Sequence, residues 1–276
     1  MASQTDAGPG DLQELSRKLR VDIIRMIEAA GSGHPGGSLS VIDILAALYT
    51  RVLRHRPAQP DWPDRDRVVL SKGHACPALY AILAQCGYFP AEKLKTMRKL
   101  ESPLQGHPDR LRLPGIEAST GSLGQGLSIA LGMALAGKLD KKDYRVWCVS
   151  GDGEMQEGQV WEALMAAPKF GLDNLTLIVD HNNGQIDGKV SEIMDIEPLA
   201  EKLRAFRWDV AEIDGHDFAR ILPALESAGR SSKPLAIIAK TVKGKGISFM
   251  EGVIDWHGKA PSKEEAERAV REIQNA

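Results

Sequence analysis

The segment with the clearest chemical potential is VSGDGEMQEG at 149–158, where Asp152 lies between two glycines directly after an apolar stretch. Gly-Asp-Gly is ordinary turn chemistry, so a tight turn is one interpretation. A phosphate or metal site is the other, because glycines let the backbone approach an anion while a carboxylate holds a cation. The segment by itself leaves both interpretations open.

A second polar loop, DHNNGQIDG at 180–188, also follows an apolar stretch. Asn182 comes 30 positions after Asp152, and a strand–helix–strand unit has about that length, so both loops are expected at one edge of a parallel sheet. A carboxylate, an amide oxygen and a carbonyl from a Gly-containing turn form a hard-oxygen set that suits Mg²⁺ or Ca²⁺. A plain Asn-Gly turn is the alternative for this loop.

Four histidines lie in tight segments with glycine or proline beside them: His34 in SGHPGGSLS, His74 in SKGHACPALY, His107 in QGHPDR and His257 in DWHGKAP. A histidine in a loop is ordinarily a solvated or capping residue, since loops are surface segments. Here the glycines permit close approach to a ligand. An imidazole in such a position can donate to a phosphate or transfer a proton near neutral pH.

Composition narrows the class of protein. The 276 residues carry a net charge of −2, with a pI near 6.4, which gives no sign of a nucleic-acid or membrane partner. Three cysteines without a CxxC pair indicate a reducing compartment. The N-terminus lacks the pattern of a secretory signal, and the weakly polar run at 127–137 is too short to span a bilayer. We therefore expect a cytoplasmic protein with a disordered tail at 1–10 and one domain at 11–276.

Hydrophobic periodicity predicts the elements that must position these residues. The expected strands are almost continuously apolar, as in a sheet covered by helices on both faces. Their alternation with amphipathic helices predicts an α/β fold with a doubly wound, mainly parallel sheet. Strands are expected at 67–71, 144–150, 175–180, 209–214 and 234–242, and helices at 12–30, 40–49, 76–86, 91–100, 159–170, 198–206, 218–228 and 262–273.

The paired GDG and NN loops resemble the signature of the thiamine diphosphate enzymes. Together with STGSLGQGLSIALGMA at 119–134, KTVKGKGISFMEG at 240–252 and the four histidine segments, they make the chain similar to transketolase. The resemblance runs from about residue 17 to residue 261, with six motifs in the family's order. It implies the diphosphate-binding (PP-type) fold, thiamine diphosphate with Mg²⁺, for which Ca²⁺ can substitute, and two-carbon ketol transfer from a ketose phosphate to an aldose phosphate in the pentose phosphate pathway.

The resemblance also implies roles for individual residues. Metal ligands are implied at Asp152, Asn182 and the Gly184 carbonyl. Cofactor contacts are implied at Lys72, His74, Gly121, Ser122, Leu123, Gly153, Asn182, Lys243 and His257. Catalytic roles are implied for His34, His107 and His257, the first two facing the substrate. Glu157 and Glu162 match acidic positions that meet at a subunit interface.

Three of these assignments have simple structural alternatives. Lys243 can be a solvated loop lysine. The glycines around Gly121 can serve close packing at a helix start. Glu157 and Glu162 can be solvated carboxylates favoured by a helix dipole.

A complete transketolase is more than twice as long as this chain. The family's pyrimidine-binding domain supplies the glutamate that contacts the aminopyrimidine, and also most of the sugar-phosphate contacts. We therefore expect a separate partner chain with the pyrimidine-binding and C-terminal domains, in an α2β2 assembly with the cofactor at the chain interface. The alternative is a fragment of a longer transketolase.

Three other functions remain open at this point. One is the E1 α subunit of a 2-oxoacid dehydrogenase, which shares the GDG…N signature but not the histidine segments. Another is a transketolase-like enzyme that acts on a sulfosugar or a branched sugar phosphate. The third is a non-catalytic binding protein on the same scaffold.

Overall fold

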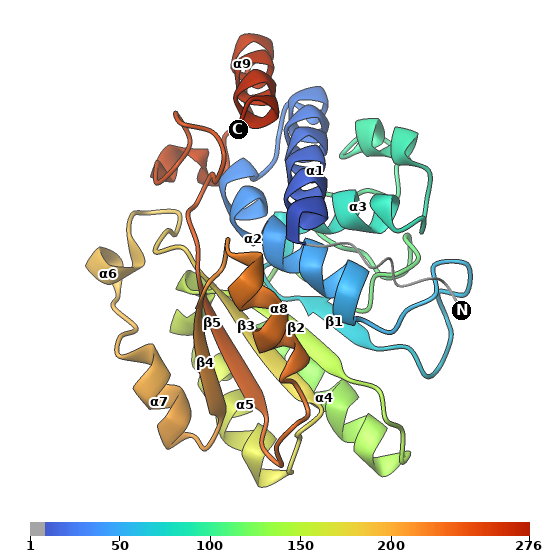
Figure 1. The fold of residues 1–276 in the computed structure, drawn as a ribbon, viewed down its shortest axis with the longest axis vertical. Helices are drawn as coiled ribbons and strands as arrows, with labels where there is room; N and C mark the ends of the chain where they lie inside the picture. Colours follow the sequence, from blue (N-terminus) through green and yellow to red (C-terminus); the bar gives the residue numbers. More distant parts are fainter. Residues whose placement is uncertain (1–8) are drawn as a thin grey trace.

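The computed structural model describes residues 9–276, and in that part of the chain the centre is a five-stranded parallel sheet (Figure 1). Its order is β1-β2-β3-β5-β4, with every neighbouring pair parallel. The strands are β1 (Arg67–Leu70), β2 (Val146–Gly151), β3 (Leu175–His181), β4 (Asp209–Asp214) and β5 (Leu235–Lys240). The predicted α/β fold with a parallel sheet is confirmed.

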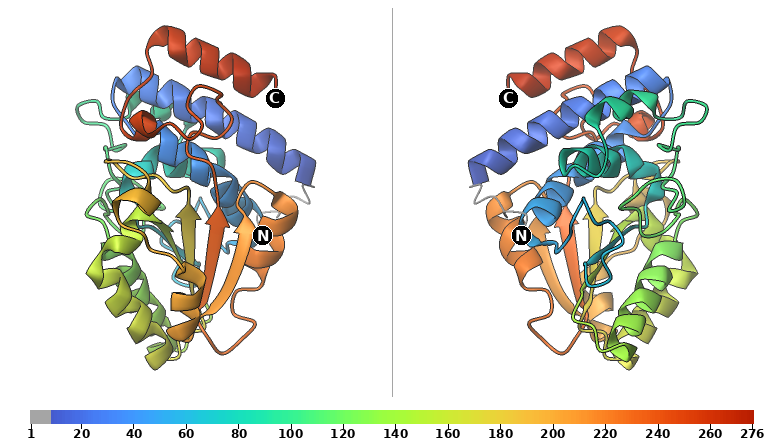
Figure 2. Two further views of the ribbon diagram at one scale, coloured as in Figure 1. Left: turned by 90° about the vertical axis from the view of Figure 1, so that its left-hand side faces the viewer. Right: turned by 90° about the vertical axis from the view of Figure 1, so that its right-hand side faces the viewer.

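Helices cover both faces of the sheet, so the fold has three layers (Figure 2). One face carries α4, α5 and α7, the other carries α1, α2, α3 and α8, and α9 lies along α1. No helix within residues 9–276 combines the length and apolar character needed to cross a bilayer. The helices are α1 (Pro9–Ala30), α2 (Pro35–Ala47), α3 (Cys76–Gln85), α4 (Gln125–Leu139), α5 (Gly158–Lys169), α6 (Val190–Ile193), α7 (Leu199–Ala205), α8 (Phe218–Glu226) and α9 (Lys263–Gln274).

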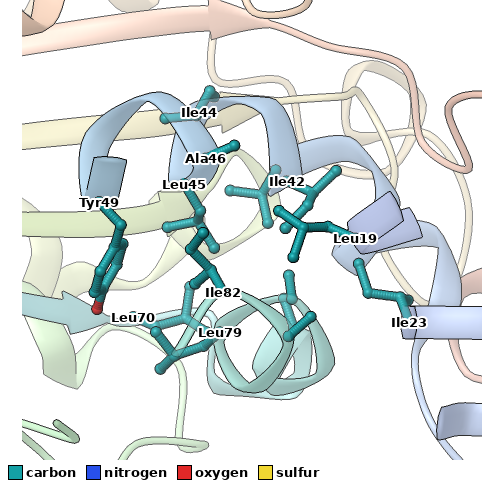
Figure 3. Close-up of a cluster of buried hydrophobic side chains, with 14 of the residues drawn as sticks. Leu19, Ile23, Ile42, Ile44, Leu45, Ala46, Tyr49, Leu70, Leu79 and Ile82 are labelled. Atoms are coloured by element: carbon teal, nitrogen blue, oxygen red, sulfur yellow. The ribbon is translucent and has the colours of Figure 1, made fainter. Parts of the chain in front are cut away.

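Successive strand residues enter different cores, as the alternation of side chains along a strand requires. In β1, Val68 and Leu70 pack with α1, α2 and α3, whereas Val69 packs with α4 and α5. Figure 3 shows the first of these cores, where side chains of α1, α2, α3 and β1 meet. The sheet is therefore buried on both faces, which explains why its strands read as continuous apolar runs.

Helix α2 lies at the centre of one layer, and all thirteen of its residues are buried. The prediction of a helix at 40–49 was wrong at its start, because the helix begins five residues earlier, at Pro35. Proline fits a first helical turn, where its missing N–H is not needed. The two glycines that follow have low helix propensity, and for this reason the sequence pattern did not predict a helix start here. Gly36 is nevertheless required, since a Cβ there would lie 2.9 Å from the Trp256 carbonyl oxygen.

Two further boundaries differ from the predictions. The helix expected at 91–100 is a short 3₁₀ helix, Ala91–Thr96, because Arg98 adopts a φ of 58° and its amide donates to the Leu104 carbonyl at 2.8 Å. Helix α1 begins at Pro9, so the last two residues of the predicted disordered tail are helical. The rest of that tail, 1–8, lies outside the described residues. The other predicted elements are present with ends shifted by one or two residues.

Candidate functional site

The loops after β1, β2, β3 and β5 meet at the carboxyl edge of the sheet, where ligands bind in parallel α/β folds. They enclose a cavity of about 340 Å³. It brings together nearly all of the residues singled out in the sequence. The predicted residues that line it are His34, Lys72, His74, His107, Gly121, Leu123, Asp152, Gly153, Glu157, Asn182, Gly184, Lys243 and His257.

Asp152 is buried at the end of β2 and connects the two predicted loops. Its Oδ1 accepts a hydrogen bond from the Gly153 amide at 2.8 Å, and its Oδ2 accepts one from the Asn183 amide. No ion pair joins it to a basic side chain in residues 9–276. Burial raises the pKa of Asp152, and so does the nearby charge of Asp180. A cation at this carboxylate would relieve both effects.

The second loop presents oxygen atoms to the same cavity. Asn182 Oδ1 accepts from the Gly184 amide at 3.0 Å, while its Nδ2 donates to Ser40 and to Asp180. The described residues contain no cluster of three His, Cys, Asp or Glu side chains that could hold a metal. The set formed here is instead one carboxylate, one amide oxygen and the Gly184 carbonyl, which are hard oxygen donors of the kind Mg²⁺ prefers.

Lys72 lies at the floor of the cavity, almost fully buried. Its ammonium pairs with Asp180 and also donates to the Gly37 carbonyl at 3.3 Å. Burial acts to raise the pKa of Asp180, but the charge of Lys72, with hydrogen bonds from Lys72, Ser40 and Thr241, holds it below its ordinary value. The floor of the cavity is thus an ion pair in which the carboxylate also accepts several hydrogen bonds.

Lys243 forms part of the wall and is equally buried, at 2% exposed. Its ammonium donates to the Gly184 carbonyl at 3.0 Å and to His257 Nδ1 at 2.9 Å. No carboxylate forms an ion pair with it in the part of the chain that the structure describes. Burial, and then the charge of Lys72, lowers the pKa of Lys243 to about 8. Its solvated-loop alternative is therefore wrong.

Three histidine rings pack against one another beside these lysines. The ring centroids of His34, His74 and His257 lie 5.1 to 5.6 Å apart. Burial is the largest cause that lowers the pKa of each ring, to about 4 for His34 and about 3 for His257. All three are neutral at neutral pH, so each can offer one N–H donor. His34 Nδ1 is buried without a hydrogen-bond partner among the described residues.

His107 lies at the side of the cavity, with its ring centroid 6.4 Å from that of His34. Gly121 packs on the His107 ring, and a Cβ at Gly121 would lie 3.0 Å from its Cδ2. Gly121 and Leu123 line the cavity, whereas Ser122 between them is not a lining residue. Within the predicted cofactor segment, Gly121 and Leu123 therefore reach the cavity and Ser122 does not.

The two predicted interface glutamates lie in different places. Glu157 is the N-cap residue of α5 and lies at the rim of the cavity. Glu162 lies one turn further along α5, exposed and outside the cavity. Both are accessible to another chain, and their interface role stays a prediction.

Two buried carboxylates were missed by the sequence reasoning. Asp180 pairs with Lys72, as described above. Glu154 accepts hydrogen bonds from Ser71 Oγ at 2.5 Å, the Gly124 amide at 2.8 Å and Ser150 Oγ at 2.9 Å, and so holds three segments around the Gly-Asp-Gly turn. Each residue lies within or directly beside a motif already quoted, but burial is what distinguishes it, and burial is not visible in the sequence.

Comparison with known proteins points to the same family as the sequence motifs. Residues 12–274 match the family described as transketolase, thiamine diphosphate binding domain. The chain is 47% identical over 265 residues to the 6-deoxy-6-sulfo-D-fructose transketolase subunit SqwG of a Clostridium species, covering 96% of each chain. It is 42% identical over 263 residues to an apulose-4-phosphate transketolase subunit from Phocaeicola vulgatus, covering 95% of this chain and 93% of that one.

Solved structures are similar over the same region. Transketolase from Campylobacter jejuni superposes with a TM-score of 0.90 at 39% identity, and transketolase from Leishmania mexicana with 0.90 at 32% identity. Each comparison covers 95% of this chain. The chain spans only 42% and 41% of those two longer proteins.

Proposed function

The chain belongs to the transketolase family through its thiamine diphosphate-binding domain, and we propose that it is the cofactor-binding subunit of a split transketolase. The observation that carries the proposal is the convergence of the predicted metal, diphosphate and histidine residues in one cavity at the carboxyl edge of the sheet. The complex transfers a two-carbon ketol unit from a ketose to an aldose, with thiamine diphosphate supplying the carbanion chemistry.

Mg²⁺ is held by Asp152, Asn182 and the Gly184 carbonyl in this proposal. The support is the buried carboxylate without an ion-pair partner among the described residues, together with the hard oxygens beside it. In the structure the Lys243 ammonium donates to the Gly184 carbonyl at 3.0 Å. We infer that Lys243 leaves this oxygen to the metal and donates to the diphosphate instead.

The neutral histidines then act as donors and proton carriers. His74 and His257 donate to the diphosphate, while His34 and His107 orient the substrate and hold or move its proton. The support is their packing around one cavity, and the lowered pKa values that keep each ring neutral, with one N–H donor and one lone pair. Gly121 and Leu123 face the cofactor's rings.

The partner is a separate chain that carries the pyrimidine-binding domain, in an α2β2 assembly. Two relatives of nearly the same length are named as transketolase subunits, and longer transketolases continue well beyond the matched region. We place Glu157 and Glu162 at this interface because both are exposed, Glu157 at the cavity rim as the cap of α5 and Glu162 further along that helix. These comparisons favour transketolase over an E1 α subunit or a non-catalytic scaffold.

The donor is proposed to be a ketose with a terminal anionic group. One relative is named for 6-deoxy-6-sulfo-D-fructose and another for apulose-4-phosphate, so a sulfosugar and an unusual sugar phosphate are candidate donors in addition to the common ketose phosphates. A ketol-transfer assay of the reconstituted complex with each donor distinguishes these donors.

We further propose a cytoplasmic location, which the free thiols of Cys76, Cys86 and Cys148 support. We also propose that residues 11–276 form one domain.

The test is Asp152→Asn, which keeps the size of the side chain but removes its charge. We expect the Mg²⁺-dependent affinity of the complex for thiamine diphosphate to fall at least about 100-fold, since a lone carboxylate carries the charge of the site. Isothermal titration at several Mg²⁺ concentrations measures it. Asp187→Asn, at the exposed rim of the same cavity, is the matched control and should leave the affinity within about twofold. Equal affinity in Asp152→Asn and wild type would refute the metal assignment.

A further inference from the structure

The segment after β5, residues 241–246, carries Lys243 into the cavity and is fastened on several sides. Thr241 Oγ1 donates to Asp180 at the cavity floor. The Gly244 amide donates to the Gly36 carbonyl in the first turn of α2 at 3.0 Å. Two further contacts of this segment come from a largely buried polar network outside the cavity, to which no role has been assigned above.

This network consists of Arg20, Asp43 and His216. Arg20 from α1 donates to both carboxylate oxygens of Asp43 in α2, at 2.8 and 2.7 Å. His216, in the turn between β4 and α8, places its Nδ1 2.7 Å from Asp43 Oδ2. Arg20 and Asp43 are 7% and 4% exposed. Burial acts to raise the pKa of Asp43, but Arg20 and His216 lower it to about 2, so the carboxylate is charged.

The hydrogen bonds fix the tautomer of His216. The Val242 amide donates to His216 Nε2 at 2.9 Å, and because a backbone N–H is only a donor, Nε2 must carry the lone pair. The proton of the neutral ring is therefore on Nδ1, from which it is donated to Asp43. The charged carboxylate favours this tautomer, so Asp43 makes His216 an acceptor for the backbone next to Lys243.

The same network fastens the other side of Lys243. Arg20 Nε donates to the Lys245 carbonyl at 3.1 Å, and a Cβ at Gly246 would lie 3.2 Å from Arg20 Cδ. Val242 and Lys245 flank Lys243, and each is held by a residue that pairs with Asp43. One buried carboxylate thus orients both of these contacts to the backbone around the lysine.

We propose that Arg20, Asp43 and His216 are positioning residues that hold Lys243 at the diphosphate end of the cavity. The part that concerns the cofactor rests on the function proposed above. The network touches neither cofactor nor substrate in this assignment, and it acts through the backbone at Val242 and Lys245. It gives His216, which lies outside the four histidine segments although it also follows a glycine, a role behind the cavity wall.

Two variants separate the two hydrogen bonds of His216. In His216→Asn the side-chain amide replaces the Nδ1 donor to Asp43 but cannot reach Val242. In His216→Gln the longer side chain replaces the Nε2 acceptor for Val242 and gives up the Nδ1 position. Each variant loses one hydrogen bond and keeps the Arg20–Asp43 pair, so neither leaves a buried charge without a partner. A comparable loss of stability is expected in both.

The first measurement is hydrogen exchange of the Val242 amide in the free full-length chain. We expect exchange at least about tenfold faster in His216→Asn than in His216→Gln, with the amides of β2 as the internal control. The second is the affinity of the reconstituted complex for thiamine diphosphate at saturating Mg²⁺. There we expect a loss of about tenfold in His216→Asn, with recovery to within about threefold of wild type in His216→Gln.

Equal exchange at Val242 in the two variants would overturn the proposal, because a merely structural histidine loses stability equally in both. Unequal exchange with equal cofactor affinity would overturn the link to Lys243. If the wild-type complex bound no cofactor at all, the proposed function would fail. The exchange contrast would still decide whether His216 holds the segment.

Discussion

The floor and the wall of the cavity each contain a buried lysine, and the two are held in opposite ways. Lys72 at the floor pairs with Asp180, and the carboxylate of Asp180 also accepts hydrogen bonds from Ser40 and Thr241. Lys243 in the wall donates to a carbonyl and to a neutral imidazole, with no carboxylate in an ion pair with it among residues 9–276. The first is a buried ion pair, and the second is a buried ammonium whose proposed partner is an anionic ligand.

This difference places the uncompensated positive charge of the cavity at the wall and not at the floor. Burying an ammonium without an opposite charge is unfavourable, and the lowered pKa of Lys243, about 8, reflects that cost. A diphosphate beside the wall would remove the cost, whereas the floor has nothing to gain from it. The two lysines should therefore respond differently to substitution, one in stability and the other in ligand affinity.

The largest effect is expected at the floor. Lys72→Met leaves the fully buried Asp180 without its cation, and we expect the free energy of unfolding to fall by about 3–5 kcal/mol. Urea denaturation measures it, with the exposed Lys99→Met as the control. Adding Asp180→Asn should recover part of the loss, since the uncompensated charge is then gone. A loss below about 1 kcal/mol would show that the floor is not a structural pair.

The next effect is expected at the wall, in the affinity for the cofactor and not in the free energy of unfolding. Lys243→Met removes a cation that has no ion-pair partner among the described residues, so we expect the free energy of unfolding to change by less than about 1 kcal/mol. Affinity of the assembled complex for thiamine diphosphate should fall about 10- to 100-fold, the equivalent of one charge-assisted hydrogen bond. Urea denaturation measures the first quantity and titration calorimetry the second. A destabilisation as large as that of Lys72→Met would remove the distinction between the two lysines.

The third effect is a pH dependence of the free energy of unfolding that involves His34. His34 binds its proton with a pKa of about 4 in the folded chain, against an ordinary value of 6.5. Between these values His34 holds more protons in the unfolded chain than in the folded chain, so its contribution lowers stability as the pH drops from 6.5 towards 4. Urea unfolding of wild type and His34→Asn across this window should give a shallower slope for the variant. Parallel slopes would show that His34 is as free to take up a proton as in the unfolded chain.

Much of the fold could be predicted from the sequence, because its strands and most helices carry strong local patterns. The position of Asp152 and Asn182 at one sheet edge followed from their spacing and the parallel topology. The start of α2 could not be predicted, since Gly36 and Gly37 are poor helix formers, and Gly36 is present to admit Trp256 and Lys243. A tertiary contact overrides local propensity there.

The polar networks beneath the site could not be predicted from the sequence. Lys72 and Asp180 are 108 positions apart, and Asp43 and His216 are 173 apart. No spacing rule relates such residues, and each looks like an ordinary charged or loop residue in its own segment. The motifs marked the residues that face the cavity, while the residues that hold them in place are recognised only by burial and hydrogen bonding.

The parallel sheet has a consequence for the order in which the chain folds. Every strand pairing closes a connection that contains at least one helix or long loop, and such non-local contacts form slowly. The packing of α1 against α2 involves neighbours in sequence and can form early, but the cavity needs the carboxyl ends of β1, β2, β3 and β5 together. An intermediate that lacks any one of these connections lacks the cavity, so cofactor capture is a step that only the completed fold can perform.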